Sequence, residues 1–250
     1  MTTIATTRSA GVPRPRRTSP GRSLVHVVGE LMITLGVVML LLVVYQLFWT
    51  NIESNRKAHQ IESQLREKWA LPPTKGPKIP GDAVGIMYIQ RLGKTWEKPV
   101  VEGVDLDDLA KGVGHFMETA EPGEVGNFAV AAHRATHGEP FANLNAIQPG
   151  DKVIVETRTD WYTYTVDKMP GASADHPAWK LVDPNFGAVV LPVPEKPGVI
   201  ATKKLLTLVT CNPRWGHTTR LIVYGHMTKD VKKTPGANFS DLDYFNGKKG

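Results

Sequence analysis

The alternation of apolar and polar residues sets one segment of this 250-residue chain apart from the rest. Residues 24–49 are almost continuously apolar. At a rise of about 1.5 Å per residue, a helix of this length spans a hydrocarbon layer of about 30 Å. Tyr45, Phe48 and Trp49 at its far end are typical of an interfacial aromatic belt. The pattern therefore predicts a transmembrane helix near the N-terminus.

A cleaved signal peptide is the alternative interpretation of this apolar segment. The apolar region of a signal peptide is shorter, and a cleavage site formed by small residues follows it. Here the apolar segment is followed by Thr50-Asn51-Ile52-Glu53, which offers no such site. We therefore expect an uncleaved anchor.

The segments on either side of the predicted anchor are polar. The first is rich in Thr, Ser, Pro and Arg and has no acidic residue, which predicts a disordered tail. After the anchor, apolar residues recur with helical spacing up to Trp69, and a proline-rich run then ends the pattern. We expect a basic cytoplasmic tail at 1–23, the anchor at 24–49, a stalk and linker at 50–75, the folded domain at 76–228 and a flexible tail at 229–250.

Beyond the stalk, the pattern is one of short strands separated by turns. The segments are rich in β-branched and aromatic residues and are bounded by Gly, Pro and Asp. The predicted strands are 83–89, 100–101, 127–132, 152–157, 161–168, 188–191, 205–210 and 220–227, with brief helices at 106–111 and 141–146. This pattern is typical of a mainly β domain, either an antiparallel barrel or a sandwich.

The distribution of charge narrows the class of partner. The net charge is +6, and most of this excess comes from the tail, which contains Arg8, Arg14, Arg16, Arg17 and Arg22. An excess of basic residues before an apolar segment favours a cytoplasmic N-terminus, with the folded domain on the other side of the membrane. The rest of the chain is nearly balanced, so we expect no basic surface for phosphates and no nucleic-acid partner.

The single cysteine of the chain, Cys211, is the main candidate for chemistry. Stable thiols outside the cytoplasm normally form disulfides, and Cys211 has no partner cysteine. An unpaired cysteine in an exported protein is either an intermolecular bridge or a reactive thiol. A lone cysteine at the end of an apolar strand is also commonly a small buried hydrophobe, but the exported location favours reactivity.

A thiol attacks a carbonyl group as the thiolate, which requires a nearby base or cation. The candidate bases are the histidines of the exported domain, namely His115, His133, His137, His176, His217 and His226. His133 follows the apolar segment 127–132 and is therefore expected at a strand end, on a rigid support. Arg220 opens the strand after Cys211, so a hairpin returns its permanent positive charge towards the thiol.

The sequence does not favour a metal or a cofactor. His133 and His137 have the i, i+4 spacing of a metal-binding pair, but that spacing brings two side chains together only on a helix. The preceding apolar strand, together with Gly138 and Pro140, argues against a helix there. The acidic residues are scattered and form no calcium loop, and the attack of a thiol on a carbonyl group needs no cofactor. We therefore expect none.

The residues around the cysteine resemble the TLxTC signature of the sortase family, here Thr207-Leu208-Val209-Thr210-Cys211. A histidine that ends a strand beginning Gly126-Asn127, and an arginine nine residues past the cysteine, complete the set of that family. The segment 112–123, and the order of tail, anchor and C-terminal domain, further resemble the class E sortases of actinobacteria. Ala132 departs from the pattern, because many members have glycine before the histidine.

The resemblance implies an eight-stranded β-barrel preceded by one transmembrane helix. It implies a membrane-anchored cysteine transpeptidase, a thiol peptidase that cleaves an LPxTG or LAxTG sorting signal through a thioacyl-enzyme intermediate. The implied partners are secreted proteins that bear this signal, and a cell-wall precursor whose amine accepts the acyl group. Cys211 is implied as the nucleophile, His133 as the general acid and base, and Arg220 as the stabiliser of the substrate and the oxyanion.

We expect Thr210, His115, Asn127 and His217 to bind the substrate; the resemblance favours His115, and His217 lies in the loop between Cys211 and Arg220. For His115 the residues alone leave a turn cap as an alternative, and for His217 a purely structural role.

Two other functions stay open from the sequence. An L,D-transpeptidase also uses Cys and His on a β-rich fold outside the membrane, but its cysteine lies in an SHGC-x-R type of motif. The segment Val209-Thr210-Cys211-Asn212 does not match that motif. The second alternative is a non-catalytic anchored binding domain, whose buried thiol would resist alkylation until the domain unfolds.

Overall fold

The computed structural model of the chain describes residues 20–70, 81–234 and 239. The chain divides into two compact units, residues 1–46 and residues 47–250. Most of the predicted N-terminal tail, part of the predicted linker and most of the predicted C-terminal tail lie outside the described residues. The domain boundaries therefore stay predictions.

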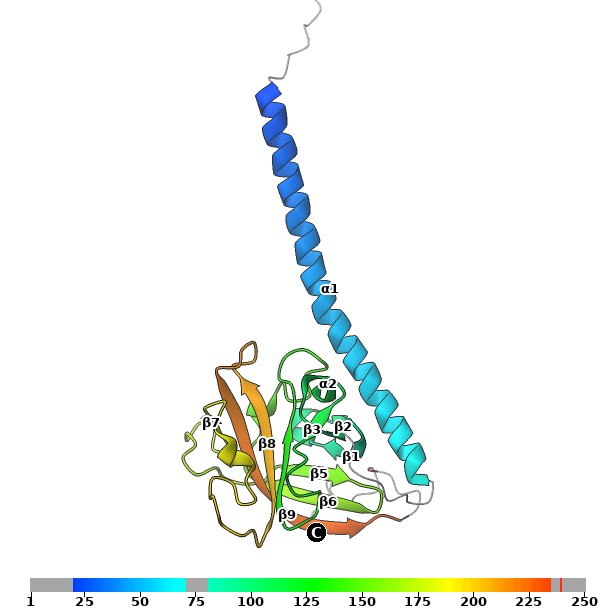
Figure 1. Ribbon diagram of the computed structural model, residues 1–250, viewed down its shortest axis with the longest axis vertical. Coiled ribbons are helices and arrows are strands. Elements are labelled where there is room, and N and C mark those ends of the chain that lie inside the picture. The colour runs from blue at the N-terminus through cyan, green and yellow to red at the C-terminus, as the bar shows by residue number, and fades with distance from the viewer. Residues whose placement is uncertain (1–19, 71–80, 235–238, 240–250) are drawn as a thin grey trace, which may run out of the picture. The chain divides into compact units, whose positions relative to one another are not determined.

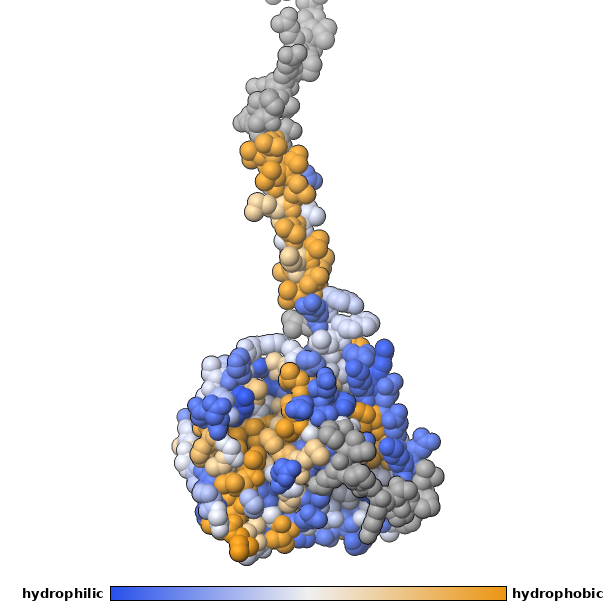
Figure 2. All heavy atoms as spheres, in the orientation of Figure 1, coloured by the Kyte–Doolittle hydropathy of each residue, from blue (hydrophilic) through white to orange (hydrophobic). Residues whose placement is uncertain are grey.

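A single long helix, α1 (Pro20–Ala70), contains the predicted anchor and continues into the second unit. In the first unit its large apolar side chains, from Leu24 to Tyr45, are exposed. Figure 2 shows them as an orange stretch of the helix. Among the described residues, α1 is the one helix long and apolar enough to cross a membrane, by length and composition.

The second unit contains a closed β-barrel of eight strands (Figure 1). The ring follows the order β6-β5-β1-β2-β3-β4-β8-β9, and the pairing of β9 with β6 closes it. Its strands are β1 (Ala83–Tyr88), β2 (Glu97–Glu102), β3 (Val113–His115), β4 (Gly126–Ala131), β5 (Lys152–Glu156), β6 (Asp160–Val166), β8 (Lys204–Asn212) and β9 (Thr219–Lys232). The short strand β7 (Trp179–Val182) pairs with the first part of β9, outside the ring. The predicted eight-stranded barrel is confirmed.

The strands β4, β8 and β9 are covered by apolar residues on both faces. The pairings β2–β3 and β4–β8 are parallel, and the other strand pairs of the barrel are antiparallel. Because successive side chains of a strand point to opposite faces, Leu206 and Leu208 pack in the barrel interior, whereas Val209 packs with Ile222 in a second cluster. This double burial explains the nearly continuous apolar sequence of β8.

The second part of α1 packs on the barrel. Leu65 belongs to an apolar cluster with Tyr88 and Trp161. The next residue, Arg66, donates a hydrogen bond to the Tyr88 hydroxyl at 2.8 Å and forms an ion pair with the fully buried Glu156 at 3.3 Å. These contacts make the stalk part of the folded unit.

One predicted strand was wrong. Residues 188–191 do not pair with a sheet, and the short 3-10 helix η3 (Gly187–Val190) lies there instead. A four-residue apolar run carries too little periodicity to separate a strand from a helical turn. The Val189 carbonyl accepts hydrogen bonds from the side chains of Asn127 and Thr207 instead of from a neighbouring strand.

Two strands, β3 and β7, were not predicted, and several boundaries differ. β3 has three residues, and its central Gly114 leaves no room for a side chain, because a Cβ there would lie 2.3 Å from the Gly103 carbonyl oxygen.

The strand predicted at 220–227 continues to Lys232 through its pairing with β6, so residues 229–232 of the predicted tail belong to β9. The helices are shorter than predicted: α2 (Leu106–Leu109) and η2 (Leu144–Ala146), with an additional η1 (Gln90–Leu92).

Candidate active site

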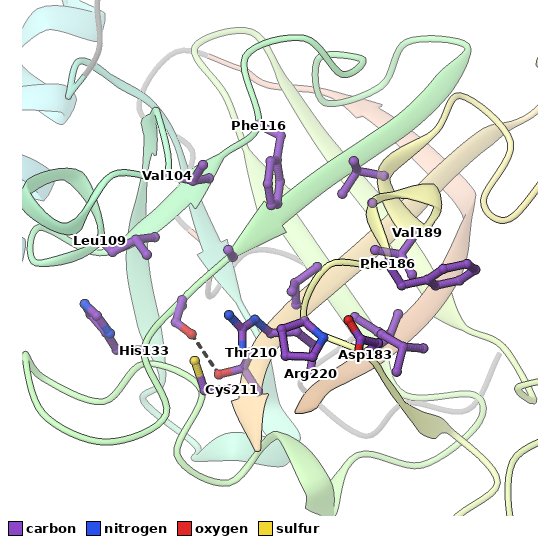
Figure 3. Close-up of a pocket in the computed structure, with 18 of the residues that line it drawn as sticks. Val104, Leu109, Phe116, His133, Asp183, Phe186, Val189, Thr210, Cys211 and Arg220 are labelled. Carbon is purple, nitrogen blue, oxygen red and sulfur yellow. Dashed lines mark hydrogen bonds between the residues drawn. The ribbon is translucent and has the colours of Figure 1, made fainter. Parts of the chain in front are cut away.

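A cavity of about 380 Å³ lies against the outer face of β4, β8 and β9 (Figure 3). Its residues come from the ends of these strands, from α2 and the start of the β3–β4 connection, and from the segment 182–190 that follows β7. The lining is mainly apolar and includes Val104, Leu109, Phe116, Val182, Phe186, Val189 and Ile222. The cavity therefore lies outside the barrel core, although barrel strands form part of it.

Cys211 and Arg220 are directly paired residues of β8 and β9. Side chains of opposed residues in an antiparallel pair lie on the same face, with Cβ atoms about 4.5–5.5 Å apart. Both residues line the cavity, and the Cys211 side chain is partly buried. The loop between the two strands thus returns the arginine to the cysteine, as the hairpin argument predicts.

The Arg220 guanidinium is hydrogen-bonded to backbone carbonyl groups. Its Nη1 donates hydrogen bonds to the carbonyl oxygens of His217 at 3.1 Å and Thr219 at 3.3 Å. Within the part of the chain that the structure describes, no acidic side chain forms an ion pair with it. A guanidinium has five N–H donors, so Arg220 keeps donors for a ligand in the cavity.

His133 lies two residues beyond the end of β4, and hydrogen bonds to β8 hold the residue before it. The Ala132 amide donates to the Val209 carbonyl at 3.2 Å, and the Thr210 hydroxyl donates to the Ala132 carbonyl at 2.7 Å. Figure 3 shows His133 and Arg220 on opposite sides of Cys211, with the Thr210 bond as a dashed line. The structure thus brings His133, Cys211, Arg220 and Thr210 to one cavity.

The surroundings of His133 favour the neutral form of its imidazole. Burial, and then the neighbouring His137, lower the pKa of His133 below its ordinary value of 6.5. The two rings stack with centroids 4.9 Å apart. The Nε2 atom of His133 is buried and has no hydrogen-bond partner among the described residues. A neutral ring with an unengaged nitrogen is suited to accept and donate a proton.

Three of the residues predicted for substrate binding do not line the cavity. His115 is fully buried in the barrel, where its Nδ1 lies 3.0 Å from Glu102 Oε2. Asn127 is buried behind the cavity wall and donates from Nδ2 to the carbonyls of Val189 and Leu191. His217 is exposed in the β8–β9 loop, and its carbonyl accepts the bond from Arg220.

One cluster of the described residues has the composition of a metal site. Ligand atoms of Glu102, His115 and Glu121 all lie within 4.8 Å of one another. However, both ring nitrogens of His115 already have partners, because Nε2 lies 3.1 Å from the Ala120 carbonyl and 3.1 Å from the Thr119 hydroxyl. The two ring nitrogens of His115 are therefore already engaged by neighbouring residues of the chain.

The sequence did not identify Arg134 or the cavity walls. Arg134 is almost fully buried, and its Nη1 donates to the Asn212 side chain and, at 3.5 Å, to the Cys211 carbonyl. Its position directly after His133 was the one available signal. Much of the wall is formed by apolar residues of connecting segments, such as Phe186, which carry no motif.

Comparison with known proteins gives one consistent family. The sortase domain family matches residues 87–228. Sortase SrtE1 of Streptomyces coelicolor is 35% identical over 231 residues, which cover 88% of this chain and 62% of that protein. Sortase SrtE2 of the same organism is 31% identical over 89% of this chain and 90% of its own length. The chain therefore spans less than two thirds of the first relative and most of the second.

Solved structures agree with this result. Sortase E from Streptomyces avermitilis is 38% identical, with a TM-score of 0.54 over 65% of this chain and 98% of its own. The SrtF sortase from Corynebacterium diphtheriae is 28% identical, with a TM-score of 0.61 over 68% of this chain and 95% of its own. Sortase E1 from Streptomyces coelicolor, solved with a tripeptide in the active site, is 30% identical, with a TM-score of 0.55 over 66% of this chain and 99% of its own.

Proposed function

The chain belongs to the sortase family, whose members are cysteine transpeptidases, and from this we propose that it cleaves an LPxTG or LAxTG sorting signal and transfers the acyl group to a cell-wall amine. The observation that carries the proposal is the direct pairing of Cys211 with Arg220 at a cavity that His133 also lines. The apolar lining suits the leucine of such a signal, since burial of apolar surface favours binding.

In the first half-reaction, neutral His133 accepts the proton of the Cys211 thiol, and the resulting thiolate attacks the carbonyl carbon of the scissile peptide. The negative charge that develops on the carbonyl oxygen is stabilised by the free donors of Arg220. His133 in its protonated form donates its proton to the leaving amine as the carbon–nitrogen bond breaks. The products are a thioester on Cys211 and the released C-terminal part of the signal.

In the second half-reaction, the acceptor amine attacks the thioester. Neutral His133 accepts a proton from this amine, a new amide bond forms, and the Cys211 sulfur leaves as the thiolate. Arg220 again stabilises the oxyanion of the tetrahedral intermediate. The proton on His133 then returns to the Cys211 sulfur, which restores the starting protonation state, so atoms and charge balance without an oxidant or reductant.

The proposal is tested with the full chain in detergent, a library of sorting peptides and an amine acceptor. Cys211→Ala should abolish both cleavage and transfer while leaving the fold intact, because the nucleophile is lost and little core volume is removed. Mass spectrometry should detect the thioacyl intermediate on the unsubstituted chain. Thr218→Ala, an exposed substitution in the same hairpin, is the control. Activity of Cys211→Ala above roughly a tenth of the unsubstituted chain would rule out the assignment.

The two alternative functions are not favoured. The family match and the relatives are sortases, and none of these comparisons points to an L,D-transpeptidase. A non-catalytic binding domain predicts a thiol that resists alkylation in the folded state, whereas Cys211 is only partly buried and lines an open cavity. Labelling of the folded chain with iodoacetamide separates these two interpretations.

We propose further that residues 24–49 anchor the enzyme, with the tail in the cytoplasm and the barrel outside. The exposed apolar side chains of α1 and the arginines of the tail support this orientation. Because Cys211 is the one cysteine of the chain, a membrane-impermeant maleimide should label it in intact cells. Labelling that appears only after the membrane is permeabilised would contradict this orientation.

A further inference from the structure

The segment 136–139, which follows His133, has an unusual backbone. Its four residues have positive φ angles, 66° at Thr136, 49° at His137, 76° at Gly138 and 48° at Glu139. Glycine adopts this left-handed region freely, but the other three residues do so against steric repulsion. Such conformations persist only where the surrounding structure holds them. The segment has an internal hydrogen bond from the Glu139 amide to the Thr136 carbonyl at 3.0 Å, and contacts from the surrounding structure supplement it.

Helix α1 provides two of these contacts through Asn51. Its Oδ1 accepts a hydrogen bond from the Gly138 amide at 3.0 Å, and its Nδ2 donates to Glu139 Oε1 at 3.2 Å. The helix also packs closely here, because a Cβ on Gly138 would lie 3.0 Å from Asn55 Oδ1 and 3.5 Å from Ser54 Cβ. Asn51 lies just beyond the predicted anchor and in the same compact unit as the barrel.

The other side of the segment is tied to the hairpin that carries the cysteine. Arg214, in the loop between β8 and β9, donates from Nη2 to Glu139 Oε2. Although burial opposes ionisation, the hydrogen bonds from Arg214 and Asn51 lower the pKa of Glu139 below its ordinary value. Glu139 is therefore a carboxylate at neutral pH and accepts from α1 and from the hairpin at once.

The segment also determines what lies against the His133 ring. His137, within the segment, stacks on that ring at 4.9 Å, and the Phe141 amide donates to the His133 carbonyl at 3.0 Å. His133 lines the cavity that contains Cys211. A change in the segment 136–139 would therefore move the stacking partner of the imidazole.

We propose that Asn51 is a positioning residue, through which the first turn of α1 beyond the anchor holds the segment 136–139 and so fixes the His133 ring relative to Cys211. This inference rests on the proposed function, which gives His133 the role of general acid and base. It makes α1 part of the catalytic apparatus as well as a candidate tether, because the helix that leaves the anchor contacts the histidine loop directly.

The test compares Asn51→Ala with Gln60→Ala in the full chain in detergent. Gln60 is exposed on the same helix, and its side chain has no described hydrogen bond, so Gln60→Ala is the matched control. We expect faster amide hydrogen exchange across 136–141 in Asn51→Ala, because the Gly138 amide loses its acceptor. With a sorting peptide selected from the library, kcat should fall roughly tenfold and KM should change less than about twofold, since a displaced catalytic group slows the reaction without removing binding contacts.

Unchanged exchange in Asn51→Ala would overturn the inference, and so would a kcat equal to that of Gln60→Ala even if exchange rises. If the unsubstituted chain cleaves no sorting peptide, the proposed function fails on its own account. The rate of Cys211 alkylation by iodoacetamide then replaces kcat, because thiolate reactivity depends on a nearby base. Equal alkylation rates in the two variants would overturn the inference in that case.

Discussion

At the scale of single residues, Arg220 offers the sharpest test of the site. Lysine would keep its charge but lose the planar fork of donors, so it cannot hold two oxygens at once. If Arg220 orients the carbonyl and stabilises the oxyanion, Arg220→Lys should lose roughly 10²-fold in turnover, the scale for removal of one oxyanion donor. Alkylation of Cys211 should change little, because that reaction forms no oxyanion. Near-full turnover by Arg220→Lys would show that Arg220 does not stabilise the oxyanion.

The pKa of His133 gives a prediction about pH. Burial, and secondarily His137, lower this pKa below 6.5, so the imidazole is mostly neutral at pH 7. The rate should depend on pH in a bell shape, with two apparent values that belong to the Cys211–His133 pair. His137→Gln removes one cause of the lowering, so the pKa of His133 rises and the limb that reports the imidazole moves to higher pH. The measurement is kcat/KM across about pH 5 to 9. If this limb of the pH profile does not move in His137→Gln, a group other than His133 is responsible for it.

The positions of some site residues in the fold could be predicted from the sequence, and those of others could not. Cys211 and His133 follow long apolar segments, so their position at strand ends could be read from the pattern. Asn127 and His115 belong to segments that match the family, but which face of a strand they occupy depends on the strand register. A shift of one residue exchanges the two faces. Since β3 itself was not predicted, nothing in the sequence could indicate that His115 lies inside the barrel.

At the scale of the elements, strand prediction worked where apolar runs were long. β4 and β8 are buried on both faces and have continuous apolar sequences, which made them recognisable. β7 has four partly exposed residues, and it exists through its pairing with β9. The apolar run 188–191 has the composition of a strand but lies in a 3-10 helix. The side chains of Asn127 and Thr207 donate hydrogen bonds to its Val189 carbonyl, where a neighbouring strand would otherwise do so. Such long-range partners cannot be read from local sequence.

The attachment of η3 to β4 gives a prediction at this scale. Asn127 donates to the carbonyls of Val189 and Leu191, in the segment that forms one wall of the cavity. Asn127→Ala removes the Asn127 donor from both carbonyls, although Thr207 still donates to that of Val189, so we expect a loss of about 1–3 kcal/mol in the free energy of unfolding. KM for the sorting peptide should rise more than kcat falls, because the wall loosens while Cys211 is unaffected.

Urea unfolding and steady-state kinetics check the Asn127 prediction. The matched control is Asn185→Ala, since Asn185 is exposed in the same connection and its side chain has no described hydrogen bond. If Asn127→Ala and Asn185→Ala have the same KM, the wall does not depend on this attachment.

At the scale of the whole molecule, the role of α1 could be predicted only in part. The helical spacing of the stalk was visible in Ile61, Leu65 and Trp69. The face that packs on the barrel also includes the buried polar residues Ser54 and Glu62, which a search for apolar periodicity passes over. The structure therefore joins residues 47–70 to the barrel in one compact unit, whereas the sequence predicted a folded domain beginning at residue 76.

Two N-terminal truncations test this packing. Removal of residues 1–46 takes away the first unit and should leave the melting temperature of the second almost unchanged. Removal of residues 1–75 also uncovers Tyr88 and Trp161 and leaves the buried Glu156 without Arg66. The lost burial of Leu65 alone is worth about 1.5–3 kcal/mol, and each kcal/mol lowers the melting temperature of a domain of this size by roughly 2–4 °C. The shorter chain should therefore melt at least several degrees lower in differential scanning fluorimetry, and equal melting temperatures would show that α1 contributes nothing to the stability of the barrel.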